Sequence, residues 1–295
     1  MTDAALLALA LLRIEGVGRV TVGRLLRHFP SYEALRGYPR EQVLARLKGV
    51  RHASDLVHRL FDPDVMAPLL AEAASEMAAL ADRHITVLTC RDEAWPEGWA
   101  ALPAGVRPAV FFTYGATEVL RRPVVALMAH PPLDDHAFET AQALVRYLGR
   151  SPFLPGTGLT SGFDVVVHKL AVAARHPALL LAPCGLARLP APMRPAASAT
   201  VRHGGLLGTP FSLEHGPFPH DERDTLWLLA ALARAIVLVD PRPDTAAWDA
   251  MTWALASHRP VFGIPGATDT LPEPVHRLRT EEDFDWVRAA VELTP

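Results

Sequence analysis

The sequence predicts an α/β protein in which a small N-terminal helical domain precedes a doubly wound, mostly parallel sheet. Residues 1–82 place apolar side chains at helical spacing, whereas after residue 84 short apolar runs alternate with helical patterns. Apolar runs separated by helices are typical of parallel strands buried on both faces. The chain has 295 residues, half of them hydrophobic, which is enough for two domains. We expect these domains at 1–82 and 83–295.

Composition excludes several classes of protein. The net charge of −3 excludes a chain that holds nucleic acid through bulk charge, so any site for a polyanion is local. Two cysteines, Cys90 and Cys184, are too few for a disulfide scaffold or a zinc ribbon and indicate a reducing compartment. The apolar run 4–12 is too short to span a bilayer and has no basic segment before it. We therefore expect a cytoplasmic protein without membrane insertion.

In the helical domain, apolar residues fill 6–14 and recur at helical spacing through 22–29. Ser31 follows Pro30 and is placed to cap the next helix, and a last helix is expected over 68–83. Residues 13–59 hold ten Arg or Lys and four acids, a local charge of +6 on an otherwise acidic chain. This block favours a polyanion or an acidic partner, and solvated helix faces are the alternative.

After residue 84 the elements follow from alternating patterns in the sequence. Short apolar, β-type runs predict strands, and longer segments with apolar residues three and four positions apart predict helices. The expected strands are 85–88, 109–115, 124–128, 178–181, 235–239 and 260–264. The expected helices are 134–150, 165–174, 225–234 and 245–256.

The clearest N-terminal motif is Ile-Glu-Gly-Val-Gly at 14–18, directly before a helical pattern. A Gly-hydrophobic-Gly turn between two short helices points backbone N–H groups outward at a helix start, which suits a phosphate. A weaker echo follows at 47–51, and two such units are the pattern of helix-hairpin-helix modules. The alternative is that the glycines only let two helices turn and pack, or dock a protein. The predicted DNA contacts in this domain are Gly16, Val17, Gly18, Arg19, Arg24 and Lys48.

A second glycine-containing loop spans 156–162 and runs into a helical pattern. Glycines admit a ligand backbone closely, and the following helix offers its N-terminus. Asp164 and His168 are four residues apart and share one helix face, although Asp164 could serve only as a helix cap. A later strand ends in Pro-Gly at 265–266, where the alternative is a plain strand exit. In a doubly wound sheet such loops line the crevice that usually binds ligands.

Several motifs stand in the order known from one family: the Gly-Val-Gly hairpin, an entry segment at 92–115, the loop 157–168, Gly-Gly-Leu-Leu at 204–207, and Arg-Pro-Val-Phe-Gly-Ile-Pro-Gly at 259–266. The chain resembles the DprA/Smf family of DNA-processing proteins over nearly its whole length. The resemblance implies a Rossmann-like sheet behind a helix-hairpin-helix or SAM-like domain. In the loop, the chain keeps the family residues Gly158, Leu159, Gly162, Asp164 and His168.

The chain departs from the family pattern where cations are expected. Ala-His-Pro at 129–131 replaces Gly-Ser-Arg, and Ser161 stands where a basic residue is frequent. The family's Phe-Pro-x-Arg-Asn-Arg reads Phe-Pro-His-Asp-Glu-Arg at 218–223, so only Arg223 remains. Ser-Gly-x-x-x-Thr reads Thr-Ala-Ala-Trp-Asp-Ala at 245–250. We therefore expect an eroded anion pocket in a divergent member.

The resemblance implies a non-enzymatic recombination mediator. Such a protein binds single-stranded DNA, forms a homodimer through its Rossmann-like domain, and loads a RecA-type recombinase during natural transformation, in competence. It implies no cofactor, metal or catalytic residue. The DNA contacts expected in this domain are Gly158, Ser161, Gly162, Asp164, His168, Lys169, Arg223 and Gly266.

Two alternatives stay open from the residues. One is a sensor or hydrolase for a nucleotide or small phosphate, and the other is a scaffold that keeps only dimer and partner surfaces. The sequence holds no His-Glu-x-x-His, Gly-x-Ser-x-Gly or Walker motif. Cys184 is expected as a small buried residue rather than a nucleophile.

Overall fold

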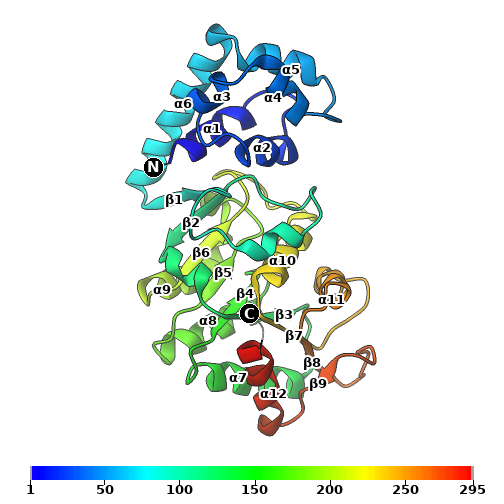
Figure 1. Ribbon diagram of the computed structural model, residues 1–295. Coiled ribbons are helices and arrows are strands. Elements are labelled where there is room, and N and C mark those ends of the chain that lie inside the picture. The colour runs from blue at the N-terminus through cyan, green and yellow to red at the C-terminus, as the bar shows by residue number, and fades with distance from the viewer. Residues whose placement is uncertain (1, 294–295) are drawn as a thin grey trace. The chain divides into compact units, whose positions relative to one another are not determined.

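A computed structural model describes residues 2–293 of the chain (Figure 1). It divides into two compact units, which we describe separately. The helical unit comprises Met1–Trp95 and Pro103–Thr113, and the α/β unit comprises Pro96–Leu102 and Tyr114–Pro295. In the part of the chain that the structure describes, no helix has both the length and the apolar character needed to cross a membrane.

The helical unit is built around the packing of its first helix on its last (Figure 1). Its helices are α1 (Asp3–Leu12), α2 (Arg19–Leu26), α3 (Tyr32–Arg36), α4 (Arg40–Arg46), α5 (Ala53–Leu60) and α6 (Pro63–Asp82). Leu7 and Leu11 of α1 are fully buried in this core. Ser31 caps α3 by accepting a 3.0 Å hydrogen bond from the N–H of Ala34, which confirms that prediction.

The prediction for the last helix of this unit was wrong at its start. α6 begins at Pro63, five residues before the expected position, because Asp62 caps it and Pro63 occupies its first turn. Pro68 lies inside the helix. The unit also contains β1 (Ile85–Leu88), as predicted, and most of β2 (Phe111–Gly115).

The α/β unit carries a parallel sheet in the order β6-β5-β4-β3-β7-β8-β9 (Figure 1). The strands are β3 (Val124–Ala129), β4 (Leu154–Thr157), β5 (Leu179–Leu181), β6 (Leu206–Thr209), β7 (Ala235–Val239), β8 (Val261–Ile264) and β9 (His276–Arg277). Strand order reverses at β3, since later strands add first on one side and then on the other. The fold is thus the predicted doubly wound, Rossmann-like sheet.

Helices cover both faces of this sheet. They are α7 (Asp135–Leu148), α8 (Gly162–Ala173), α9 (Arg194–Arg202), α10 (Asp221–Leu232), α11 (Ala246–Ala256) and α12 (Phe284–Leu293). Side chains of α7, α8 and α12 share one buried core with alternate residues of β3, β7 and β8. α10 and α11 pack against each other and contact the sheet outside this core, in a second layer of helices. α10 begins four residues earlier than predicted.

Three strands, β4, β6 and β9, were not predicted. β4 contains Pro155 and Gly156, which normally argue against a central strand. Gly156 is needed there, because a Cβ atom at this position would lie 2.7 Å from Cγ1 of Val124 on the neighbouring strand. β6 directly follows Gly204 and Gly205. Because glycines are unfavourable in strands, the short apolar run at 206–207 does not stand out as a strand in the sequence.

Candidate nucleic-acid interface

The helical unit contains two turns with the same geometry. In the first, the N–H of Val17 donates to the carbonyl of Ile14 at 3.0 Å, and in the second the N–H of Val50 donates to Leu47 at 2.9 Å. The third residue of each turn is a glycine with positive φ, +81° at Gly16 and +84° at position 49. Such a φ favours glycine, so both glycines are set by the turn itself.

Two arginines connect these turns in opposite directions. Arg24 of α2 donates from Nη1 to the carbonyl oxygen of Lys48, at 2.7 Å. Arg59 of α5 donates from Nη1 to the carbonyl oxygen of Glu15, at 3.4 Å. Each acceptor directly precedes the glycine of a turn, and each donor lies on the helix that follows the other turn. The structure thus brings Arg24 and Lys48 together. Sequence reasoning missed Arg59, although its place in the helix after the second turn was a usable signal.

The exposed side of both turns is open. A Cβ atom at Gly16, Gly18 or Gly49 would meet no described atom within 4 Å. Among the described residues, no side chain caps α2, which begins after Gly18, or α5, which begins after His52. In the same unit α1, α3 and α6 have side-chain caps, whereas α4, which follows Pro39, has none. The two helices that follow the glycine turns therefore keep first-turn N–H groups for an external acceptor.

Other cations of the helical unit differ in how they are used. Arg13 forms ion pairs with Glu76 and with Glu72, so its charge is compensated on α6. The pKa of His28 is lowered first by burial and then by Arg46, Arg27 and Arg91. Arg91 lies outside the basic block, and it donates to the carbonyl oxygens of Leu26 and Arg27 at the end of α2. A positive cluster therefore gathers beside the C-terminus of α2. Arg19 opens the same helix and is half-buried.

In the α/β unit, the predicted loop leads from β4 into α8. The carboxylate of Asp164 accepts the N–H groups of Thr160 and Ser161, each at 2.7 Å, in a capping box. Asp164 thus caps its helix, which was the alternative to the predicted DNA contact; the DNA contact stays a prediction. Burial raises the pKa of Asp164 to about 6, against the effect of these hydrogen bonds. Two N–H groups of this loop are therefore already bonded within the protein.

His168 is completely buried one turn further along α8. Its Nε2 lies 2.9 Å from Oγ1 of Thr157 and its Nδ1 lies 3.3 Å from Oγ1 of Thr200. Burial lowers the pKa of His168 to about 3, so the imidazole is neutral at neutral pH. His168 thus connects β4, α8 and α9 and presents no charge to a ligand.

The two glycines of this loop have different surroundings. A Cβ atom at Gly158 would lie 2.5 Å from Cδ2 of Leu226 on α10, whereas one at Gly162 would meet no described atom within 4 Å. Gly158 therefore allows helix packing, and Gly162 is the open position at the start of α8. Ser161 is nearly buried beside it. Lys169 is exposed in the second half of α8.

The segment 218–223 leads into α10, which begins at Asp221. Asp221 has no exposed surface and accepts a 2.8 Å hydrogen bond from the N–H of Phe218. Nε2 of His215 lies 3.1 Å from both oxygens of Asp221, and Nε2 of His220 lies 3.4 Å from one of them. Arg223 is exposed on the first turn of α10, and the Phe218 side chain is 51% exposed. An acid thus occupies the position of the first expected cation.

A second acid lies where the strand order reverses, the place at which doubly wound sheets usually bind ligands. Asp240, directly after β7, accepts the N–H of Asp134 at 3.0 Å and a guanidinium hydrogen of Arg242 at 3.2 Å. A Cβ atom at Gly266 would lie 2.0 Å from Oδ1 of Asp240. Gly266 therefore makes room for a carboxylate of the protein. Cys184 is buried, as expected.

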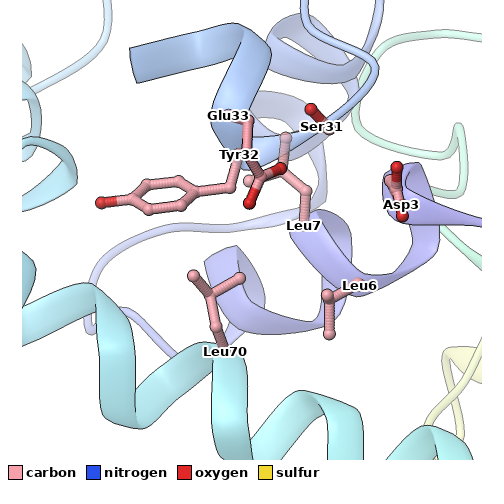
Figure 2. A pocket seen from close by; sticks show the side chains of 7 residues that line it. All are labelled: Asp3, Leu6, Leu7, Ser31, Tyr32, Glu33 and Leu70. Carbon is pink, nitrogen blue, oxygen red and sulfur yellow. The ribbon is translucent and has the colours of Figure 1, made fainter.

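A pocket of about 480 Å³ lies in the helical unit (Figure 2). It is lined by Asp3, Leu6, Leu7, Ser31, Tyr32, Glu33 and Leu70. Two carboxylates and three leucines do not suit a phosphate. Nothing in the sequence had singled out this pocket.

Comparisons with known proteins concern the family and the fold of the chain. A family model described as "DNA recombination-mediator protein A" matches residues 86–281. The fold is similar to DNA processing protein A from Streptococcus pneumoniae, with a TM-score of 0.63, 15% identity, and coverage of 90% of this chain and 96% of that one. It is also similar to DNA processing protein A from Helicobacter pylori, with a TM-score of 0.59, 16% identity, and coverage of 70% of this chain and 96% of that one. The description of the Helicobacter pylori structure names a single-stranded DNA binding mode for that protein.

A search of curated proteins finds no match. At these identities the solved structures establish the fold, and the family model establishes the family. The family consists of DNA-binding recombination mediators and not of enzymes. Because its model matches more than half of the sequence, this chain belongs to the DNA recombination-mediator protein A (DprA) family.

Proposed function

We propose that this protein binds single-stranded DNA and loads a RecA-type recombinase onto it during natural transformation. The observation that carries the proposal is the family match over 86–281, which supplies the recombination-mediator role. Single-strand binding is named for the Helicobacter pylori relative, and we extend it to this chain.

In the helical unit, we assign the DNA contact to the pair of glycine turns. Gly16, Gly18 and Gly49 leave room for a close approach, and α2 and α5 start without a side-chain cap. A phosphate oxygen can accept the N–H groups at such helix starts, which is attractive because the helix dipole is positive there. The exposed Lys48 adds a cation within the second turn. This type of contact holds the DNA backbone and does not read bases.

In the α/β unit, the bound DNA strand would run along the carboxyl ends of the parallel β-strands. Gly162 is open, Arg223 is exposed, and Phe218 offers half of its ring to solvent. Aromatic rings stack on bases of single strands, which duplex DNA does not offer. Asp221 lowers the positive potential of this edge. We therefore propose that the helical unit carries a larger share of the affinity than in a family member with the full set of cations.

The geometry does not favour a nucleotide sensor. Asp240 already occupies the crevice where doubly wound sheets usually hold a phosphate, and it is bonded to the start of α7. A free phosphate would have to displace a carboxylate that two donors hold.

We also propose a homodimer formed by the α/β unit. Trp286 on α12 is 62% exposed and stacks on His276 with ring centroids 6.1 Å apart. An exposed aromatic of this size is typical of an interface centre. Light scattering of the full chain and of Trp286→Arg checks this. A wild type that stays monomeric, or a variant that dimerises equally well, would contradict it.

The proposed function is tested by titrating the full chain with single-stranded and duplex oligonucleotides between about 50 and about 200 mM salt. We expect preference for the single strand and an affinity that falls steeply with salt. A parallel assay follows recombinase ATP hydrolysis on single strands coated with single-strand-binding protein, with and without this protein. Absence of DNA binding at the lowest salt would reject the proposal, and binding without stimulation of the recombinase would reject its loading role.

A further inference from the structure

We propose that His215 and His220 are proton-controlled contacts for the phosphates of single-stranded DNA, held in place by the buried carboxylate of Asp221. This inference rests on the proposed function and concerns how the α/β edge binds its strand. It predicts that the affinity for single strands rises as pH falls through the range in which imidazoles titrate.

The two imidazoles are fixed by stacking as well as by the carboxylate. The His215 ring stacks on Phe211 with centroids 4.5 Å apart and an interplanar angle of 4°. The His220 ring stacks on Phe218 at 6.0 Å and 2°. Asp221 contributes one oxygen near both Nε2 atoms and accepts the Phe218 N–H with the other. The rings therefore have defined positions whether or not they are charged.

The pair lies where a DNA strand would pass. Asp221 opens α10, and five residues later Leu226 packs against Gly158 of the β4–α8 loop. On its other side the N–H of Gly185, after β5, donates to the carbonyl of His215 at 2.8 Å. The cluster thus stands at the carboxyl ends of β4 and β5. The His220 side chain is 70% exposed there and that of His215 is 29% exposed.

The other charged groups around His215 and His220 are mostly acidic, so protonation of the two imidazoles decides the net charge of this site. α10 contributes the acids Asp221, Glu222 and Asp224 and the cation Arg223. The loop before His215 contributes Glu214, which pairs with Arg188 at 3.0 Å. Cys184, after β5, is the remaining titratable group, and burial followed by Asp221 raises its pKa to about 11, so it stays neutral. The charged groups around the two histidines are therefore four carboxylates and two guanidinium groups.

The surroundings therefore carry two net negative charges while both imidazoles are neutral, and none when both are protonated. A polyanion is repelled by the first state and accepted by the second. Nε2 of each ring faces Asp221, so a protonated ring would offer its second N–H group, at Nδ1, to a phosphate oxygen. Each such contact adds about 0.7 to the slope of log affinity against log salt for a single strand.

The test uses the full chain and an oligothymidylate, because thymine does not titrate in this range. Affinity is measured by fluorescence anisotropy at several salt concentrations, at about pH 5.5 and about pH 8. We expect the wild type to bind more tightly at the lower pH, with a slope that steepens by about 0.7 for each imidazole. The double variant His215→Gln with His220→Gln keeps polar side chains and should lose this pH response.

A matched control is His203→Gln, because this exposed histidine ends α9 at the opposite edge of the sheet and should keep the wild-type response. Circular dichroism at each pH verifies that every variant is folded. Asp221→Asn is a second variant, and it should raise the affinity at about pH 8 by removing one negative charge. Equal pH responses in the wild type and the double variant would overturn proton control and leave the proposed function standing. A wild type that binds no oligothymidylate at either pH would overturn both.

Discussion

The guanidinium of Arg24 donates a 2.7 Å hydrogen bond to the main-chain oxygen of Lys48, the residue before the glycine of the second turn. Arg59 makes the corresponding bond to Glu15 before the first turn. The turns are therefore connected by two side chains that run in opposite directions. A nucleic-acid backbone has a fixed spacing of phosphates, so two contact points are useful only when their separation is held.

Gly18 gives a direct test of the phosphate cap on α2. Gly18→Ser and Gly18→Asp should both stabilise the helical unit by a few tenths of a kcal/mol, because each side chain can cap the helix. Only the aspartate places a negative charge where the phosphate would lie. We expect Gly18→Asp to reduce the salt slope for single strands by about 0.7, and Gly18→Ser to weaken binding by a smaller amount, because its hydroxyl occupies the same N–H groups without a charge. Thermal unfolding and salt-dependent anisotropy provide the two readouts.

The serine variant is the matched control, since it blocks the same N–H groups without adding charge. Equal DNA binding by the wild type and Gly18→Asp, in folded protein, would show that no phosphate approaches this helix start.

Lys48 and Arg24 should respond differently to substitution. Lys48 offers its main-chain oxygen to Arg24 and its exposed side chain to solvent, so Lys48→Ala should weaken DNA binding and leave stability unchanged. Arg24→Met removes a charged hydrogen bond at the surface and should cost about 0.5–1 kcal/mol of stability as well. Urea unfolding of the full chain separates the two cases. A large loss of stability in Lys48→Ala would contradict this division of roles.

Elements with a clear pattern were predictable from the sequence. β1 and β7 lie where the apolar runs placed them, and Thr245 caps α11 one residue before its first helical residue. β4 was not predictable from local pattern, because Pro155 and Gly156 are strand-breaking residues that only the neighbouring strands make acceptable. The strand depends on the tertiary contact of Gly156 with Val124.

The candidate site was predictable in its segments and less so in the roles of its residues. Spacing placed Asp164 and His168 on one helix face, and the structure shows that this face points inward. Periodicity cannot tell an inward polar face from a ligand-binding face when helices cover both sides of a sheet. Two partners decide the matter: Thr157 lies on β4, a strand that was not predicted, and Thr200 lies on α9, 32 residues from His168.

The two glycines of the β4–α8 loop should differ in stability tests. Gly158→Ala places a methyl group 2.5 Å from Leu226 and should cost about 1–3 kcal/mol through overpacking. Gly162→Ala meets open space in the first turn of α8 and should be neutral or stabilising by up to about 1 kcal/mol. Urea unfolding at neutral pH measures both. Equal costs for the two variants would mean that Leu226 moves aside freely.

The last prediction concerns the pH dependence of stability, where His168 and Asp164 act in opposite directions. The pKa of His168 is about 3 in the folded protein and near 6.5 when exposed, so its contribution is complete above pH 6.5 and is lost as pH falls. Taken alone, it lowers the free energy of unfolding by about 2 kcal/mol at pH 5. The pKa of Asp164 is raised from 3.8 to about 6, so its contribution grows as pH falls from about 6 to 3.8.

We therefore expect wild-type stability to fall between about pH 6.5 and about pH 6 and then to stay nearly level to about pH 4. In His168→Gln the Asp164 contribution remains for the α/β unit in this window, and the stability of this unit should rise by about 1.4 kcal/mol per pH unit below about pH 6. Asp269 and Asp283 have lowered pKa values and act only below this window. Urea unfolding followed by tryptophan fluorescence reports on the α/β unit, which holds five of the six tryptophans. Parallel pH profiles of the wild type and His168→Gln would show that the buried imidazole does not set this dependence.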